Sequence, residues 1–235
     1  MKTRSTQASA ILEFYQKLKP PSGIPAGIAV LDPFKDKNVW NICEQFYTRF
    51  YSDYKPRIFL FGINPGRFGG GITGIPFTDP IRLEKCCGIP NELAKRAELS
   101  SLFIYELIEA FGGVDLFYGK FLFTALSPLG YTKNEKNLNY YDDKSLLKSC
   151  EPFILSTIRK QLADIKTIKT ALCLGEGQNF NYFQQLNQKH RLFEEIHPLP
   201  HPRWIMQYRR KKLNEYVEKY LELLKKVSDR ELIKI

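Results

Sequence analysis

The chain has 235 residues and a formal net charge of +10. Its apolar fraction of 43% and charged fraction of 26% are typical of a soluble globular protein with a full core. No run approaches the ~20 apolar residues that span a bilayer, and the N-terminus lacks an apolar signal core. We therefore expect a cytoplasmic protein without a membrane partner. The basic excess predicts attraction to polyanions, nucleic acid first, although a protein that is merely basic is the alternative.

The five cysteines predict neither a metal site nor a redox site. Their number is odd, and no two of them have the C-x-x-C spacing of such sites. They are Cys43, Cys86, Cys87, Cys150 and Cys173. We expect all five to be reduced. The chain also lacks a Walker phosphate loop and a recognisable nucleophile motif, so no metal and no cofactor are expected.

Hydrophobic periodicity predicts alternating helices and strands. The predicted helices cover residues 8–18, 40–54, 99–111, 144–165, 179–188 and 204–226. Short apolar runs predict buried strands at residues 57–62, 121–126, 170–174 and 192–196. Residues 20–36 are expected to form an extended arm, and residues 132–143 a polar loop.

Strands separated by helices of this length pair in parallel through right-handed crossovers. The expected fold is a three-layer α/β/α domain with a central, mainly parallel, four-stranded sheet. We expect a single domain over residues 1–235, with an N-terminal helical and extended arm over residues 1–54 and a C-terminal basic helix over residues 204–226. The carboxyl ends of parallel strands meet at one edge, where open α/β sheets bind ligands. The loops that should converge there follow residues 62, 126, 174 and 196.

The first of these loops, Phe61–Phe77, is too rich in glycine and proline to continue as strand or helix. It carries one carboxamide, Asn64, and the aromatic ring of Phe68 as well as that of Phe77. Residues 69–74 match the G-x-G-x-x-G dinucleotide fingerprint. They begin seven residues beyond the strand, and a proline follows where a helix should open. A nicotinamide- or flavin-dependent enzyme is therefore the weaker alternative.

The predicted convergence brings Asn64, Ser127 and Gly175 into one crevice with His197 and His201. Each residue alone has a structural interpretation, because asparagine caps turns and loop histidines are commonly satisfied locally. Together they place a carboxamide, an imidazole and an aromatic ring in a basic protein. That set suits a base pulled out of a nucleic acid and stacked on a ring, with a water held beside its sugar.

The loop Gly62–Phe77 resembles the first motif of the single-strand-selective monofunctional uracil-DNA glycosylases, Asn-Pro-Gly-x-Phe-Gly followed at the same spacing by Thr-Gly-x-Pro-Phe. The His-Pro loop near residue 200 resembles the second motif of the uracil-DNA glycosylase superfamily. The resemblance covers residues 55–212 at the level of the fold. It implies hydrolysis of the N-glycosidic bond of a uracil flipped out of DNA, leaving an abasic site for base-excision repair. No lysine is placed as a nucleophile, so we expect no lyase step.

By this resemblance, Asn64 positions the attacking water and Phe77 stacks on the base. Gly66 lies where the classical uracil enzymes carry a bulky tyrosine, so uracils with a substituent at C5 should fit. Backbone N–H groups near Ile63 and Phe77 would donate to the uracil carbonyls. The residues expected to contact the base are Gly62, Ile63, Gly66, Phe68, Phe77 and Asn139.

The resemblance leaves two candidates for the catalytic histidine, which would donate a hydrogen bond to the base O2 as negative charge develops. His197-Pro-Leu-Pro matches the family's His-Pro-Ser-Pro, whereas His201 lies deeper in the loop. We favour His201, because the catalytic histidine normally enters from the loop. Arg203 and Trp204 lie where the family inserts a wedge into the base stack, with helix core as the alternative for Trp204. The expected DNA contacts are Ser127, Pro128, Gly175, Arg203, Trp204, Arg209, Arg210 and Lys211.

At one position the chain departs from the family pattern. The family reads the uracil edge with an asparagine in a stretch like Asn-x-Cys-Pro-Leu, and here Ala125 takes that place. Either the reading residue has moved to Asn137 or Asn139, or base recognition is altered. A nucleic-acid-binding module that kept the fold and lost catalysis is the main alternative. The expected partner is DNA containing uracil or a related lesion, bound by a monomer.

Overall fold

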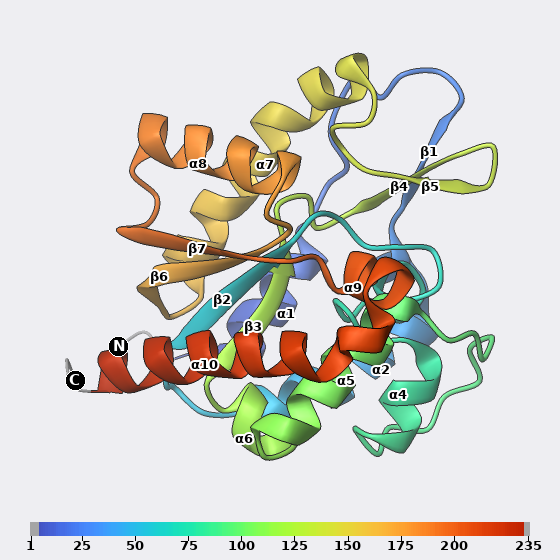
Figure 1. Ribbon diagram of the computed structural model, residues 1–235. Helices are drawn as coiled ribbons and strands as arrows, with labels where there is room; N and C mark the ends of the chain where they lie inside the picture. The colour runs from blue at the N-terminus through green and yellow to red at the C-terminus, as the bar shows by residue number, and fades with distance from the viewer. Residues whose placement is uncertain (1–4, 233–235) are drawn as a thin grey trace.

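The central sheet has four parallel strands in the order β3-β2-β6-β7. They are β2 (Arg57–Gly62), β3 (Phe121–Ala125), β6 (Thr167–Leu174) and β7 (Glu195–Leu199). The computed structural model describes residues 5–232, so both ends of the predicted domain, 1–4 and 233–235, lie outside the described residues. Helices cover both faces of the sheet (Figure 1). The predicted three-layer α/β/α fold with a four-stranded parallel sheet is confirmed.

Helices form the two outer layers. In Figure 1, α5 and α10 lie on one side of the sheet, and α7 and α8 lie on the other. The longer helices are α1 (Gln7–Gln16), α2 (Lys37–Tyr51), α5 (Leu99–Phe111), α7 (Lys144–Asp164), α8 (Gln178–His190) and α10 (Leu213–Leu232). The short ones are α3 (Gly70–Thr73), α4 (Pro80–Lys85), α6 (Val114–Tyr118) and α9 (Pro202–Tyr208). In the part of the chain that is described, no helix combines the length and apolar character needed to cross a membrane.

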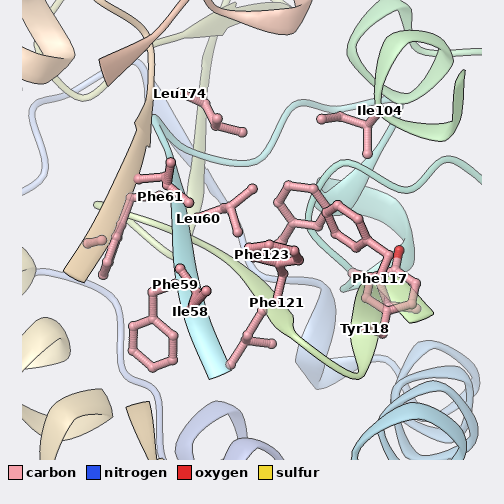
Figure 2. Packing of buried hydrophobic residues seen from close by; sticks show 14 of the residues in the cluster. Ile58, Phe59, Leu60, Phe61, Ile104, Phe117, Tyr118, Phe121, Phe123 and Leu174 are labelled. Carbon is pink, nitrogen blue, oxygen red and sulfur yellow. The ribbon is translucent and has the colours of Figure 1, made fainter. Parts of the chain in front are cut away.

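Strand β2 runs through the middle of the core, and all six of its residues are buried. A parallel strand covered on both faces needs apolar side chains on both, so its sequence does not alternate. Figure 2 shows Phe59 and Phe61 on one side of the strand and Leu60 on the other. Phe61 packs edge-on against Phe183 of α8, with ring centroids 4.9 Å apart. The strand that precedes the glycine-rich loop is therefore held firmly from both sides.

A second, antiparallel sheet was not predicted from the sequence. It contains β1 (Ile28–Leu31), β4 (Gly130–Lys133) and β5 (Lys136–Leu138), in the order β1-β4-β5. The expected extended arm and polar loop contribute these strands. The β4–β5 hairpin turns at Asn134 and Glu135, whose φ angles are 48° and 58°. Hairpin turns of this type usually carry glycine, and glutamate gives no such signal.

Strand β7 begins three residues later than predicted, at Glu195 where the sequence predicted a strand over residues 192–196. Phe193 is buried ahead of the strand, and the Asn187 side chain bonds its backbone N–H and C=O, at 2.8 and 3.0 Å. A side chain thus satisfies the backbone groups that strand pairing would otherwise take. Pairing with β6 starts at Glu195, which places His197 inside the strand.

The predicted C-terminal helix, 204–226, is two helices. α9 ends at Tyr208, and a 3₁₀ turn, η2 (Arg210–Lys212), leads into α10. Between them, Arg209 leaves the helical region, with φ −132° and ψ 19°. Its guanidinium donates to the carbonyl of Tyr208 at 3.0 Å, which satisfies an acceptor at the helix end. The basic run therefore forms the joint between two helices.

Arg57 is fully buried at the start of β2. Its Nε donates to the carbonyl of Tyr118 at 2.7 Å, and its Nη1 donates to the carbonyl of Lys55 at 2.7 Å. The two terminal nitrogens also bind the Asp53 carboxylate, at 3.0 and 2.9 Å. One guanidinium therefore ties the start of the central strand to the end of α6 and to the turn before β2.

We expect Arg57→Ala to lower the free energy of unfolding by about 3 kcal/mol or more, because it leaves buried acceptors without donors and opens a cavity. Arg230→Ala is the matched control. Arg230 makes an exposed ion pair with Glu195 at 2.8 Å, and its loss should cost less than about 1 kcal/mol. Urea denaturation followed by circular dichroism measures both. Equal losses would show that the buried network contributes no more than a surface pair.

Candidate active site

A cavity of about 320 Å³ lies at the carboxyl edge of the central sheet. The loop after β2, the end of β3, the start of α5, the segment around β5 and helix α9 all contribute to it. Its lining includes Gly62, Ile63, Asn64, Gly66, Phe77, Glu98, Ala125, Asn137, Asn139, His201, Arg203 and Trp204. The loops after β2 and β7 thus meet with the end of β3, as the sequence predicted. The loop after β6 lies just behind: a Cβ on Gly175 would be 3.9 Å from Cδ2 of His201.

The glycine-rich loop folds back onto the carbonyl of Gly66. The backbone N–H groups of Gly69 and Gly71 donate to this oxygen at 3.2 and 2.9 Å. A Cβ on Gly71 would lie 2.6 Å from the same oxygen, so this position needs glycine. The one-turn helix α3, which was not predicted, is too short to be the phosphate-binding helix of a dinucleotide fingerprint. Among residues 5–232, no three His, Cys, Asp or Glu side chains gather where they could hold a metal ion.

Phe77 lines the cavity from a strained backbone position. Its φ is 57°, a left-handed conformation that costs a non-glycine residue about 1 kcal/mol or more. The ring lies over Gly62, where a Cβ would be 2.7 Å from Cζ of Phe77. Its centroid is 5.2 Å from that of Phe123 and 6.2 Å from that of His201. This half-buried ring can stack on a planar ligand in the cavity.

The Asn64 side chain is oriented by the second sheet. Its Nδ2 donates to the carbonyl of Leu138 at 3.2 Å, and its Oδ1 accepts from the backbone N–H of Tyr140 at 3.0 Å. The amide is therefore fixed at both ends by a segment more than 70 residues away in the sequence. One N–H and one lone pair remain for a ligand or a water.

His201 begins helix α9 and faces the cavity as a neutral donor. Its Nδ1 accepts a hydrogen bond from the backbone N–H of Arg203 at 3.1 Å. An accepting Nδ1 carries no proton, so the neutral ring holds its proton on Nε2. Burial and the nearby Arg203 guanidinium lower the pKa of His201 to about 4. At neutral pH the cavity therefore contains an imidazole with a preorganised Nε2–H.

His197, the alternative catalytic candidate, does not line the cavity. It pairs in register with Leu172 inside the sheet. Its Nε2 lies 3.0 Å from Oε2 of Glu195, which also binds Arg230. The structure brings His201, not His197, together with Asn64 and Phe77.

Sequence reasoning missed Glu98, the residue before α5. Its backbone N–H donates to Oδ2 of Asp79 at 3.0 Å, and its carboxyl lies over the glycine-rich loop. A Cβ on Gly69 would be 1.9 Å from Oε2, and one on Gly66 would be 2.6 Å from Oε1. Burial, followed by the Asp79 carboxylate, raises the pKa of Glu98 to about 7, against the opposing effect of Arg203. Nothing in the sequence places an acid beside these glycines.

Both predicted replacements for the base-reading asparagine line the cavity, as does Ala125. Asn139 is turned toward Asp142, with its Nδ2 donating to Oδ1 at 3.2 Å. Asn137 accepts a hydrogen bond from the backbone of the glycine-rich loop at 3.0 Å. Its Nδ2 lies 3.3 Å from the place that a Cβ on Gly66 would take. The Asn137 amide is thus closer to the loop than the predicted Asn139.

Two predicted DNA contacts after β3 are not supported, because Ser127 and Pro128 are buried. The Ser127 hydroxyl donates to the carbonyl of Leu129 at 2.9 Å and lies 2.9 Å from the hydroxyl of Tyr131. A hydroxyl engaged inside the protein cannot reach a phosphate from this position. Phe68 also lies outside the cavity lining, with the guanidinium groups of Arg67 and Arg96 at 4.5 and 5.2 Å from its ring centre.

Of the five residues predicted around α9, two line the cavity and three follow the end of the helix. Arg203 and Trp204 line the cavity, and Trp204 is 39% exposed. The guanidinium of Arg209 lies 4.9 Å from the centre of the Trp204 ring. Arg210 and Lys211 are exposed in the turn that follows. Trp204 is therefore a partly exposed ring beside the Arg209 guanidinium, in contrast to the helix-core alternative.

Comparisons with known proteins agree with the predicted resemblance. The sequence profile described as "Uracil DNA glycosylase superfamily" matches residues 48–225. The crystal structure of wild-type SMUG2 from Pedobacter heparinus is similar, with a TM-score of 0.93 and 42% sequence identity. The match covers 96% of this chain and 100% of that chain. No curated protein sequence matches.

We expect the imidazole of His201 to stay neutral from pH 8 down to about pH 5. Because the unfolded chain binds this proton near pH 6.5, the contribution of His201 should make the fold less stable as the pH falls from about 6.5 to about 4. NMR titration of the three histidine ring signals, assigned with His201→Gln, measures this. A midpoint near 6.5 for His201 would contradict a buried neutral ring.

Proposed function

Because the chain belongs to the uracil-DNA glycosylase superfamily, whose members act on DNA, we propose that it hydrolyses the N-glycosidic bond of uracil flipped out of DNA. Uracils substituted at C5 are proposed as further substrates. The product is an abasic site for base-excision repair, without strand cleavage. The observation that carries the proposal is that Asn64, Phe77 and a neutral His201 line the same cavity.

Asn64 is proposed to hold the attacking water. Its amide is fixed by Leu138 and Tyr140, so its remaining N–H and lone pair have set directions. A water bound there attacks C1′ of the sugar while the bond from C1′ to the base breaks. The bonding electrons leave with the base, and the proton released by the water ends on it. The fixed amide supplies orientation without having to titrate.

His201 and Phe77 are proposed to stabilise the departing base. Negative charge that develops on the base spreads to its O2, and the Nε2–H of His201 is a ready donor. A preorganised donor of this kind contributes about 3 kcal/mol to lowering the barrier. Phe77 provides the aromatic face for stacking, and among the described residues its backbone N–H has no acceptor. It is therefore available to a uracil carbonyl.

The wall at Gly66 supports the proposal for 5-substituted uracils. Gly66 has no side chain, and the nearest atoms to a Cβ there would be Oε1 of Glu98 and Nδ2 of Asn137. The wall is thus formed by a carboxyl and an amide, which can hydrogen-bond a polar group at C5, where a tyrosine ring would exclude a 5-methyl group. Ala125 adds no hydrogen bond, so other groups must read the base.

The charge distribution supports DNA as the partner. Arg203 lines the cavity, and Arg209, Arg210 and Lys211 directly follow another lining residue, Tyr208. All four cations are exposed, on a chain with a net charge of +10. Cations at a rim attract phosphates and release counterions on binding. Trp204, the exposed ring among them, is proposed to enter the stack that the base leaves.

Ala125 is the observation that favours a second candidate, a DNA-binding module of the same fold with altered or lost catalysis. Such a module would bind DNA regardless of lesions and with a steep salt dependence. It would release no base.

Incubation with uracil-containing single- and double-stranded oligonucleotides, followed by alkali, should yield cleavage at the uracil position. Without alkali the strands should remain intact, because no lyase step is expected. Oligonucleotides with 5-hydroxymethyluracil test the wider substrate range. If neither lesion is released in either strand form, the protein is the binding module.

The two histidines give a matched pair of variants. We expect His201→Ala to lower the single-turnover rate by about 100-fold or more, because a donor to the developing anion is lost, with DNA affinity changed only a few-fold. His197→Ala should leave the rate within about threefold, since it removes only a contact outside the cavity. Fluorescence anisotropy measures affinity separately. A larger loss from His197→Ala would reverse the assignment.

Asn64→Ala should likewise reduce the rate far more than the affinity, because it removes the group that orients the water. Its thermal unfolding midpoint should be measured alongside, since the amide also joins two sheets. A variant that loses rate and affinity equally would make Asn64 a structural residue.

A further inference from the structure

Glu98 places an unpartnered carboxyl in the cavity. It is half-buried, yet no hydrogen bond or ion pair with another described residue involves its side chain. Its backbone is held by Asp79 on one side and by the start of α5 on the other, where its carbonyl accepts from Leu102 at 3.0 Å. A carboxyl that is partly shielded from water and lacks a partner is costly unless it is neutral or meets a ligand.

The carboxyl is a wall of the same cavity that contains Asn64 and His201. It occupies the space that side chains at positions 66 and 69 would take, with Oε1 and Oε2 next to Gly66 and Gly69 respectively. Substituting either glycine would therefore displace it. The glycine-rich loop leaves room for an acid that comes from a different part of the chain.

The charged groups around Glu98 act in opposite directions. Asp79, from the start of α4, binds the N–H groups of Ile81 and Arg82 and pairs with the Arg82 guanidinium at 3.4 Å, and it repels a second negative charge. Arg203, from α9, attracts one, but burial outweighs it, and the pKa of Glu98 is raised to about 7. His201 faces the same cavity as a neutral ring and adds no charge. Bound DNA phosphates add negative charge and favour the protonated acid further.

We propose that Glu98 is a specificity residue, which as a neutral carboxylic acid hydrogen-bonds the edge of the extrahelical base that faces the glycine-rich loop. This rests on the proposed function. The acid offers one O–H donor and one carbonyl acceptor, so it suits a base edge with a carbonyl or a polar substituent. Ala125 leaves the base without the expected carboxamide, and Glu98 supplies comparable hydrogen-bonding groups from the glycine side of the cavity.

The neutral form is required because of the charge on the leaving group. The base departs as an anion, and an ionised carboxylate in the same cavity would repel it with little screening. A neutral acid avoids this repulsion. The rate should therefore fall as the pH rises through the ionisation of Glu98. Protonation of His201 should affect the rate only well below pH 7, because its pKa is about 4.

The test measures single-turnover rates at saturating protein on a uracil-containing single strand, from pH 5.5 to 9.5. We expect the wild-type rate to fall by about tenfold or more above the ionisation of Glu98. Glu98→Gln keeps the shape and cannot ionise, so its rate should stay level and exceed that of the wild type at high pH. Glu106→Gln is the matched control: the same change on the exposed face of α5, which should follow the wild type.

A base panel tests the contact itself. Glu98→Ala should lower the rate on 5-hydroxymethyluracil relative to uracil by about tenfold, and Glu98→Gln should largely preserve the ratio. If Glu98→Gln retains the alkaline fall, or Glu98→Ala leaves the ratio unchanged, the inference is overturned while the proposed function stands. A wild-type protein that releases no base overturns both.

Discussion

The hydrogen bonds of the Asn64 amide are the constraint on which the rest of the site depends. They join the loop after β2 to the backbone of Leu138, the last residue of β5, and of Tyr140, two residues further on. The Tyr140 hydroxyl continues to Asn179, whose Nδ2 donates to the thiol of Cys173 at the end of β6. Two sheets and a helix are thereby fixed against one another around the carboxamide. In the proposed function, the backbone at the end of the β4–β5 hairpin and just after it sets the direction of the bound water.

The inside of the cavity differs electrostatically from its rim. Exposed cations on a chain of net charge +10 attract a polyanion at long range. Inside, burial and the Arg203 guanidinium keep His201 neutral. The pKa of Glu98 is raised to about 7, so its protonated and ionised forms are both populated near neutral pH. Under the proposed function, a positive rim would hold the strand, and the uncharged imidazole of His201 inside would donate to an anionic leaving group. The proposed function therefore places the attraction of DNA at the rim and the reaction inside the cavity.

The parts that sequence predicted are those governed by local pattern. Buried apolar runs located β2 and β3, and parallel topology then brought Asn64, Phe77 and His201 to one edge. Long-range contacts governed the rest. The start of β7 depends on the Asn187 side chain, and that shift places His197 within the sheet. Glu98 reaches the cavity only through the packing of α5 against the loop, which no local pattern encodes.

The glycine pattern that matches a dinucleotide fingerprint has another physical explanation in this fold. A Cβ on Gly69 would collide with the Glu98 carboxyl, and one on Gly71 with the carbonyl of Gly66. Gly74 has a φ of 73°, and a Cβ there would lie 2.5 Å from the Cys43 thiol. At each of these positions, an atom of the chain itself lies where a side chain would have to go, so the glycines need no phosphate to explain them. The same glycines let the loop close tightly and leave room for the Glu98 carboxyl in the wall of the cavity.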